Sequence, residues 1–334
     1  MEGIIKGKLI GSHWKKISEK SIFTRSRIIN GQRQTLKIFS VGKPRLDQVL
    51  ARLPALFFEN ECKIIKSERK IMVVRLRSEI GGKIKSVYIK QHNALSFAHR
   101  LASVFCASAA MRSLSGAATL LERGYATAPP VAAVEYRHWG ILIKSLYFSE
   151  EISGAKTVES FWRNDLTALK GVGGYVRRRL LLRGLARLFK SLHANGIYHN
   201  DLKASNILVL TRGTATEAIF SLIDLQGLRK CLFVSRRRRI KNLAQLNRTL
   251  GVRLTRTQKL FFFNAYEDYP LFNRRSKRDL VQRILDQTSR QIAREKSRHG
   301  VAEHCPFVEA LPAETETRAG KREGEPFLLN SSLS

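Results

Sequence analysis

The chain has 334 residues, 43% of them hydrophobic, with 60 lysines and arginines against 27 aspartates and glutamates. This length and composition fit a globular protein with a sizeable core and exclude a disordered chain. The formal net charge of +33 favours an anionic partner, namely a membrane surface, an acidic glycolipid or a nucleic acid, over a basic surface kept only for solubility.

Two common classes of segment are missing from the sequence. No apolar run approaches the length of a membrane span, and residues 1–11 lack the long apolar stretch of a secretory signal. The cysteines lack metal-ligand spacing and are too sparse for a disulfide framework; they are Cys62, Cys106, Cys231 and Cys305. A reducing cytoplasm is therefore the expected compartment.

The N-terminal third is predicted to hold a basic arm and a small β-rich domain. Residues 1–45 form the arm, whose alternation is too poor to assign an element. A β-rich domain is expected over 46–150, where alternation predicts strands at Cys62–Lys66, Ile71–Leu76, Ile84–Lys90, Val131–Tyr136 and Gly140–Ser145. Between the third and fourth strands, apolar spacing predicts helix over 95–123, in two segments. An extended connection, Leu146–Ile152, follows the last strand.

Residues 151–300 are predicted to form a larger helical domain. Its first long helix carries an apolar stripe that ends before Gly196, a natural C-cap; the stripe consists of Tyr175, Leu181, Leu185, Leu188, Phe189 and Leu192. Helices are also expected at Leu243–Leu250 and Leu260–Tyr266. Residues 301–334 are rich in Glu, Thr, Gly and Ser without periodicity, which predicts a disordered tail.

The most informative stretch follows that helix. Residues 197–208 read Ile-Tyr-His-Asn-Asp-Leu-Lys-Ala-Ser-Asn-Ile-Leu, and Ser-Leu-Ile-Asp ends at Asp224 after a predicted hairpin. This order of Asp, Lys, Asn and a second Asp is typical of a kinase catalytic loop and its metal site. Phosphoryl transfer needs these residue types because the site must align a nucleophile and neutralise charge on phosphate oxygens. The alternative is a surface loop whose polar residues only form turns.

The motif assigns a role to each polar residue. Asp201 would be the general base toward a hydroxyl, with Lys203 beside the transferring phosphoryl group. Asn206 and Asp224 would bind one or two Mg²⁺ ions. Lys90, at the end of the third strand, would hold the α- and β-phosphates of ATP, although a strand-end lysine can also simply reach solvent.

Other parts of a kinase site lack their usual signature. No Gly-rich loop joins the first strands, so Ser67 and backbone amides are expected to cover the phosphates. Glu122 is the only acid in 95–123, and it either pairs with Lys90 or caps a helix end. The backbone near Glu150 to Ile152 is expected to bond the adenine edge.

The segment after Asp224 departs from ordinary protein kinases. Gln226 stands where the glycine of Asp-Phe-Gly is expected, and no long activation segment follows. The run Arg236 to Arg239 lies close behind and is expected to bind the acidic acceptor or a membrane leaflet. His199, before the catalytic loop, is expected to be structural.

With these residues the chain resembles the bacterial lipopolysaccharide core kinases, the Kdo/heptose kinase family within the protein-kinase-like superfamily. The matching segments are 87–90, 120–129, 199–208, 222–228 and 241–247. The resemblance implies an α+β, two-lobed protein-kinase-like fold with a small β-rich N-lobe and a helical C-lobe. It also implies ATP-dependent phosphorylation of a Kdo or heptose hydroxyl on the lipid-anchored core, by a protein peripheral to the cytoplasmic face of the inner membrane.

Two other functions remain open. A RIO-like atypical kinase or ATPase acting on a ribonucleoprotein would also suit the charge, but no aromatic-basic strands typical of RNA modules are visible. A membrane-bound pseudokinase scaffold is disfavoured because the four residues of the expected site are all present: Lys90, Asp201, Asn206 and Asp224. The sequence leaves open which sugar and which hydroxyl is phosphorylated.

Overall fold

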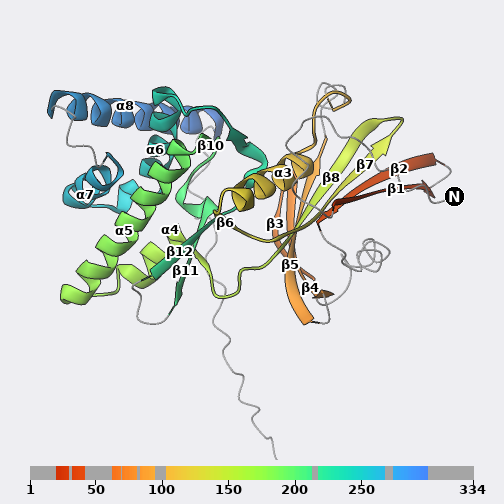
Figure 1. Ribbon diagram of the computed structural model, residues 1–334, viewed down its shortest axis with the longest axis horizontal. Helices are drawn as coiled ribbons and strands as arrows, with labels where there is room; N and C mark the ends of the chain where they lie inside the picture. Colours follow the sequence, from red (N-terminus) through yellow and green to blue (C-terminus); the bar gives the residue numbers. More distant parts are fainter. Residues whose placement is uncertain are drawn as a thin grey trace, which may run out of the picture. The chain divides into compact units, whose positions relative to one another are not determined.

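The structure is a computed structural model. It describes residues 20–29, 32–41, 62–68, 70–80, 83–94, 103–212, 217–267 and 274–299. Figure 1 shows a β-rich first part, coloured red to yellow-green, and a helical second part, coloured green to blue. The expected tail, residues 301–334, lies outside the described residues.

A seven-stranded sheet in the order β1-β2-β7-β8-β5-β4-β3 dominates the first part. The strands are β1 Lys20–Ile29, β2 Gln32–Val41, β3 Cys62–Ser67, β4 Ile71–Ile80, β5 Lys83–Asn93, β7 Pro130–His138 and β8 Ile141–Glu150. Every neighbouring pair in it is antiparallel. All five strands predicted from alternation are present, and three of them, β4, β5 and β8, extend well beyond the predicted ends.

The sequence pattern assigned no element to the basic arm, residues 1–45, but two strands of the sheet, β1 and β2, lie within it. β1 and β2 form a ten-pair hairpin, and β2 continues the sheet by pairing with β7 from Gln34 opposite His138 to Ser40 opposite Ala132. The sheet therefore begins at residue 20 rather than near residue 46. The remaining domain boundaries stay predictions.

Helix α3, Ala109–Glu122, packs on this sheet and on the segment after Asp224. It begins where the Ser108 hydroxyl accepts a hydrogen bond from the Met111 amide at 3.2 Å, a normal N-cap. A Cβ at Gly116 would lie 2.8 Å from the Leu225 carbonyl oxygen, so only glycine allows this approach. The first predicted helical segment begins at residues 95–102, which are outside the described residues.

The second part contains four longer helices and two small sheets. The helices are α5 Gly171–Ala194, α6 Arg236–Thr249, α7 Arg256–Glu267 and α8 Arg274–His299, preceded by the short α4 Val158–Ser160. One sheet has the order β6-β12-β11-β9, with strands Ala126–Thr127, Glu217–Leu222, Ile207–Arg212 and Lys156–Thr157. The other pairs β10 Ile197–His199 with β13 Leu228–Lys230.

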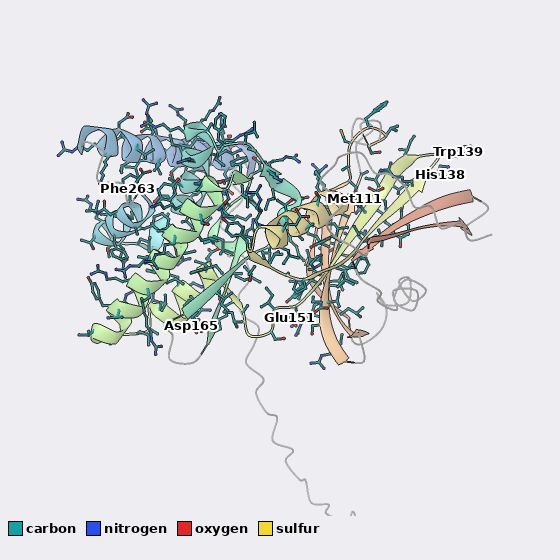
Figure 2. All side chains as sticks on the ribbon, in the orientation of Figure 1. Met111, His138, Trp139, Glu151, Asp165 and Phe263 are labelled. Carbon is teal, nitrogen blue, oxygen red and sulfur yellow. The ribbon has the colours of Figure 1, made fainter. Side chains whose placement is uncertain are left out.

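Helix α5 runs through the core of this helical part. Leu181, Leu185, Phe189 and Leu192 of the predicted stripe are buried, but Tyr175 is exposed on the first turns. Phe189 also meets Phe262 of α7 edge to face. The helix ends as predicted, with Gly196 in the left-handed region at φ +69°. Figure 2 places Phe263 of α7 among the side chains of this part. No helix within the described residues is both long and apolar enough to span a membrane.

Candidate active site

The catalytic loop begins at the end of a short two-stranded ribbon. In this ribbon β10 pairs with β13, from Ile197 opposite Lys230 to His199 opposite Leu228. The amide of Asn200 then donates to the Gly227 carbonyl at 2.9 Å. The segments before Asp201 and after Asp224, which a single hairpin separates in sequence, are thus bound side by side.

Asp201 lies at the centre of a polar cluster. Lys203 Nζ is 3.1 Å from Asp201 Oδ2, and both side chains keep a third or more of their surface exposed, 33% and 44%. Asn206 Nδ2 donates to the backbone oxygen of Asp201 at 2.9 Å and to Oδ2 at 3.2 Å. The carboxylate is therefore fixed in orientation and still reachable from solvent.

The structure brings Asp224 together with Lys90, two residues of the expected site. Lys90 Nζ is 2.6 Å from Asp224 Oδ1. Burial alone would raise the pKa of Asp224, but the Lys90 ammonium outweighs burial and brings this pKa below its usual range. The carboxylate is therefore anionic at neutral pH, the state in which it can bind a cation.

The backbone of Asp224 adopts an unusual conformation, with φ 60° and ψ 50°. Among the described non-glycine residues only Trp139, at the tip of the β7–β8 turn (Figure 2), shares a positive φ. Such a conformation costs about 1 to 2 kcal/mol for a residue with a side chain. Strain of this kind is concentrated at functional sites, which supports a functional role for Asp224.

Asn206 and Asp224 present the oxygen ligands that Mg²⁺ prefers. Asn206 is buried, and its backbone oxygen accepts from the Ile223 amide at 3.0 Å. Because its Nδ2 atom donates to Asp201, its Oδ1 atom is the one left to bind a cation. No cluster of three or more His, Cys, Asp or Glu that could hold a metal occurs within the described ranges.

His199 is structural, as expected. Its Nδ1 accepts from the Asp201 amide at 3.1 Å, so Nε2 carries the proton and donates to the Asp224 carbonyl oxygen at 3.1 Å. Burial is the main cause that lowers its pKa. A neutral imidazole therefore joins the catalytic loop to the turn at Asp224.

Two residues of α6 that were not predicted to belong to the site form hydrogen bonds with the backbone of the catalytic loop. Gln245 Oε1 accepts from the Leu202 amide at 3.0 Å, while Gln245 Nε2 donates to the Asn200 carbonyl at 2.5 Å. Asn242 Nδ2 donates to the His199 carbonyl at 2.6 Å and to Gln245 Oε1 at 3.0 Å. We call Asn242 and Gln245 the loop clamp. Both side chains are buried, so these bonds are protected from water.

The loop clamp is itself supported from α5 and α7. His193 Nε2 lies 3.1 Å from Asn242 Oδ1, and Nδ1 lies 2.9 Å from the Tyr266 hydroxyl. Burial lowers the pKa of His193 to about 4. The imidazole is therefore neutral at pH 7 and can bond both partners without bringing a charge into the core.

The arginine run, Arg236 to Arg239, is exposed throughout, but its members have different partners. Arg236 pairs with Asp279 of α8 at 2.9 Å, and Arg239 Nε donates to the Val234 carbonyl at 3.0 Å. Arg238 instead lies over the Tyr198 ring, 5.4 Å from its centroid. Beyond the run, Lys241 Nζ bonds Asn200 Oδ1 at 2.7 Å. Only part of the run faces the ribbon that leads to Asp201.

The structure does not bring Glu122 to Lys90. Glu122 is exposed at the end of α3, whereas Lys90 is paired with Asp224. His92 of β5 lies within the influence of this pair, since burial and the charge of Lys90 lower its pKa to about 4. The prediction that Glu122 helps to bind the nucleotide therefore has no geometric support here.

The remaining predicted nucleotide contacts lie at the ends of β3 and β8. Ser67 is exposed and closes β3, beside a turn in which Glu68 and Ile71 exchange backbone hydrogen bonds of 2.8 and 3.1 Å. Leu146 to Glu150 belong to β8, so the connection begins later than predicted. The Glu150 amide donates to Pro129, at 2.8 Å, and is not available to adenine.

Glu151, the first residue after β8, fixes the connection that follows this strand to the sheet. Its amide donates to the Ser86 carbonyl at 2.8 Å. Its carboxylate bonds the Arg75 guanidinium at 2.7 Å, and Figure 2 labels it beside the strands. Ile152, whose carbonyl accepts from Ala155 at 3.1 Å, is left as the predicted adenine contact in this segment.

Comparison with known proteins bears on the same residues. A model of the lipopolysaccharide kinase (Kdo/WaaP) family matches residues 62–266. A solved structure of WaaP in complex with acyl carrier protein is similar, with a TM-score of 0.50 and 25% identity over 70% of this chain and 88% of that chain. None of the curated protein sequences matches this chain. The matched range contains all the polar residues described above except those of α8, and the expected protein-kinase-like fold is confirmed by the structural likeness.

Proposed function

The chain belongs to the lipopolysaccharide kinase (Kdo/WaaP) family, and from this premise we propose that it transfers a phosphoryl group from ATP to a Kdo or heptose hydroxyl of the lipopolysaccharide core. The observation that carries this proposal is the arrangement of one site inside the matched range. Asp201 is oriented by Lys203 and Asn206, and Asp224 is paired with Lys90.

Each residue has a definite task in such a transfer. Asp201 would accept the proton of the attacking sugar hydroxyl on its exposed carboxylate. Lys203, 3.1 Å from Asp201, would keep that carboxylate oriented and place a positive charge beside the transferring group. Lys90 would hold nucleotide phosphates. Asn206 and Asp224 would hold Mg²⁺, which when bound would neutralise the negative charge on the phosphate oxygens.

The acceptor and the place of action belong to the same proposal. An anionic, lipid-anchored core sugar suits a chain of net charge +33 because opposite charge raises the local concentration of substrate at the site. The same charge would hold the protein at the anionic cytoplasmic face of the inner membrane. A ribonucleoprotein acceptor is the second candidate, and only the charge favours it.

Phosphotransfer to isolated acceptors tests the proposal directly. Purified protein, ATP and Mg²⁺ are incubated with lipopolysaccharide whose core Kdo and heptose are unphosphorylated, and the core is then analysed by mass spectrometry and NMR. We expect one added phosphoryl group on a core sugar. ATP turnover that is stimulated by RNA or ribosomal particles, with an unmodified core, would instead support the second candidate.

The metal site gives a separate prediction. Asp224→Asn and Asn206→Ala each remove or weaken a hard oxygen ligand, so both should raise the Mg²⁺ concentration that gives half-maximal phosphotransfer. Titration of activity with Mg²⁺ measures this. Asn264→Ala, at an exposed asparagine of α7, is the control and should behave as wild type. An unchanged Mg²⁺ requirement in both site variants would place the metal elsewhere.

The similar WaaP structure contains acyl carrier protein, which makes an acyl carrier protein a candidate partner of this chain too. Gel filtration of the two purified proteins, alone and mixed, tests it. A complex that elutes earlier than either protein would show that acyl carrier protein binds this chain. Separate elution at micromolar concentrations would contradict this partner.

A further inference from the structure

A short turn next to the catalytic ribbon exposes two large apolar side chains. It runs from Cys231 to Ser235 and connects β13 to α6. Leu232 is 101% exposed and Phe233 is 71% exposed. Exposing two adjacent apolar side chains of this size to water is unfavourable, and such patches usually mark an interaction site. A ligand or surface that covers Leu232 and Phe233 is therefore implied.

The turn is held rigidly at both ends. The Cys231 amide donates to the Gly196 carbonyl at 2.8 Å, and a Cβ on Gly196 would collide with the Cys231 carbonyl oxygen. On the other side Val234 is only 2% exposed, and its carbonyl accepts from Arg239. Leu232 and Phe233 are therefore presented to solvent by fixed backbone on both sides, rather than by a loose loop.

The surroundings of the turn are cationic. No aspartate or glutamate occurs between Leu228 and Lys241, a segment with seven lysines and arginines, and Arg229, Lys230, Arg237 and Arg238 are exposed. Arg238 lies against the turn itself, with one guanidinium nitrogen 2.9 Å from Cys231 Sγ. An apolar tip surrounded by positive charge matches the cross-section of an anionic bilayer, where hydrocarbon lies beneath negative headgroups.

A second exposed aromatic side chain precedes α3, a helix that contacts β13. Phe105 is 90% exposed, in the turn that leads into α3. Arg112 of α3 lies near both segments: burial, followed by the charge of Arg229, lowers its pKa, while neighbouring Cys106 raises it. The turn before α3 and the turn after β13 therefore belong to two elements that contact each other.

We propose that Leu232 and Phe233 insert into the interfacial region of an anionic lipid bilayer while the surrounding arginines and lysines bind the headgroups. The proposal rests on the proposed function, since a lipid-anchored acceptor lies in such a bilayer. The turn and Asp201 lie at opposite ends of β10. At about 3.3 Å per residue, the strand sets a fixed separation between the inserted tip and the catalytic carboxylate.

Vesicle binding by the full chain tests the insertion. Wild type, Leu232→Ser/Phe233→Ser and a control, Val172→Ser/Val176→Ser, are sedimented with phosphatidylcholine vesicles with and without phosphatidylglycerol. The control also removes two exposed apolar residues, 79% and 46% exposed on α5. We expect anionic vesicles to bind wild type and control equally, and the turn variant at least roughly tenfold more weakly. High salt should weaken binding of all three.

A reporter in the turn distinguishes insertion from contact through charge alone. Phe233→Trp should shift its emission to the blue on addition of anionic vesicles. Equal vesicle binding by the turn variant and wild type, or an unshifted emission from bound Phe233→Trp, would overturn the proposal. It would indicate that the turn binds a protein partner instead.

Activity on two acceptors separates this proposal from the function on which it rests. The turn variant should phosphorylate a deacylated, soluble core as wild type does, but a vesicle-embedded core at least roughly tenfold more slowly. Equal rates on both acceptors would contradict the membrane site while leaving the kinase function intact. Insertion without phosphorylation of either acceptor would contradict the kinase function and leave the membrane site standing.

Discussion

Replacing Asp201 with asparagine should lower phosphotransfer turnover by about 10² to 10⁴, the usual contribution of a positioned general base. Asparagine keeps the size of the side chain but cannot take the proton of the acceptor hydroxyl. Lys90 and Asp224, which are paired with each other, should be undisturbed, so ATP binding should survive. Turnover is measured with saturating acceptor and ATP, and ATP affinity by calorimetry.

Glu122→Gln is the matched control, because it also neutralises a carboxylate of the expected site. Glu122 is exposed at the end of α3, and Lys90 is paired with Asp224 instead, so loss of the Glu122 charge should change turnover by less than about twofold. Full activity of Asp201→Asn would refute the assignment of the catalytic loop. A large loss in Glu122→Gln alone would restore its predicted pairing with Lys90.

Gln245→Leu should both destabilise the protein and slow the reaction. The substitution leaves the Leu202 amide and the Asn200 carbonyl, which Gln245 bonds at 3.0 and 2.5 Å, without these partners. Each buried polar group left unsatisfied costs about 1 to 3 kcal/mol, so the loss of both bonds should lower the free energy of unfolding by about 2 to 6 kcal/mol. Because the clamped residues flank Asp201, turnover should also fall by at least about tenfold.

Denaturant unfolding and steady-state kinetics on the same samples measure both effects. Gln282→Leu serves as the control. Gln282 is exposed on α8, and its Nε2 donates to Asp286 Oδ1 one helical turn later, at 2.8 Å. The substitution should change the free energy of unfolding by less than about 0.5 kcal/mol. If the free energy of unfolding of Gln245→Leu equals that of this control, the loop clamp does not stabilise the protein measurably and the role given to it is wrong.

The catalytic loop could be predicted from sequence because its chemistry is local. Asp201, Lys203 and Asn206 lie within six residues, and a single hairpin, β11 and β12, separates them from Asp224. Strand alternation is also a local signal, since one face of each strand packs on the core. It located β3, β4, β5, β7 and β8 but not their full lengths.

Pairings between distant segments could not be read in the same way. β2 joins β7 across about a hundred residues, and no local pattern encodes that register. The loop clamp was missed because asparagine and glutamine on a helix ordinarily face water. A usable signal was present: Asn242 and Gln245 alternate with Leu243 and Leu246, so polar and apolar side chains share one buried face.

The ion pair between Lys90 and Asp224 links two binding events thermodynamically. Lys90 Nζ and Asp224 Oδ1 lie 2.6 Å apart, and under the proposed roles the pair would separate when Mg²⁺ binds the carboxylate or a phosphate binds the ammonium. The ligand that binds first would have to break the ion pair. The second ligand would then bind a side chain that no longer has an ionic partner, so it would not have to break the pair again. Metal and nucleotide should therefore bind with positive cooperativity, and by reciprocity each raises the affinity for the other by the same factor.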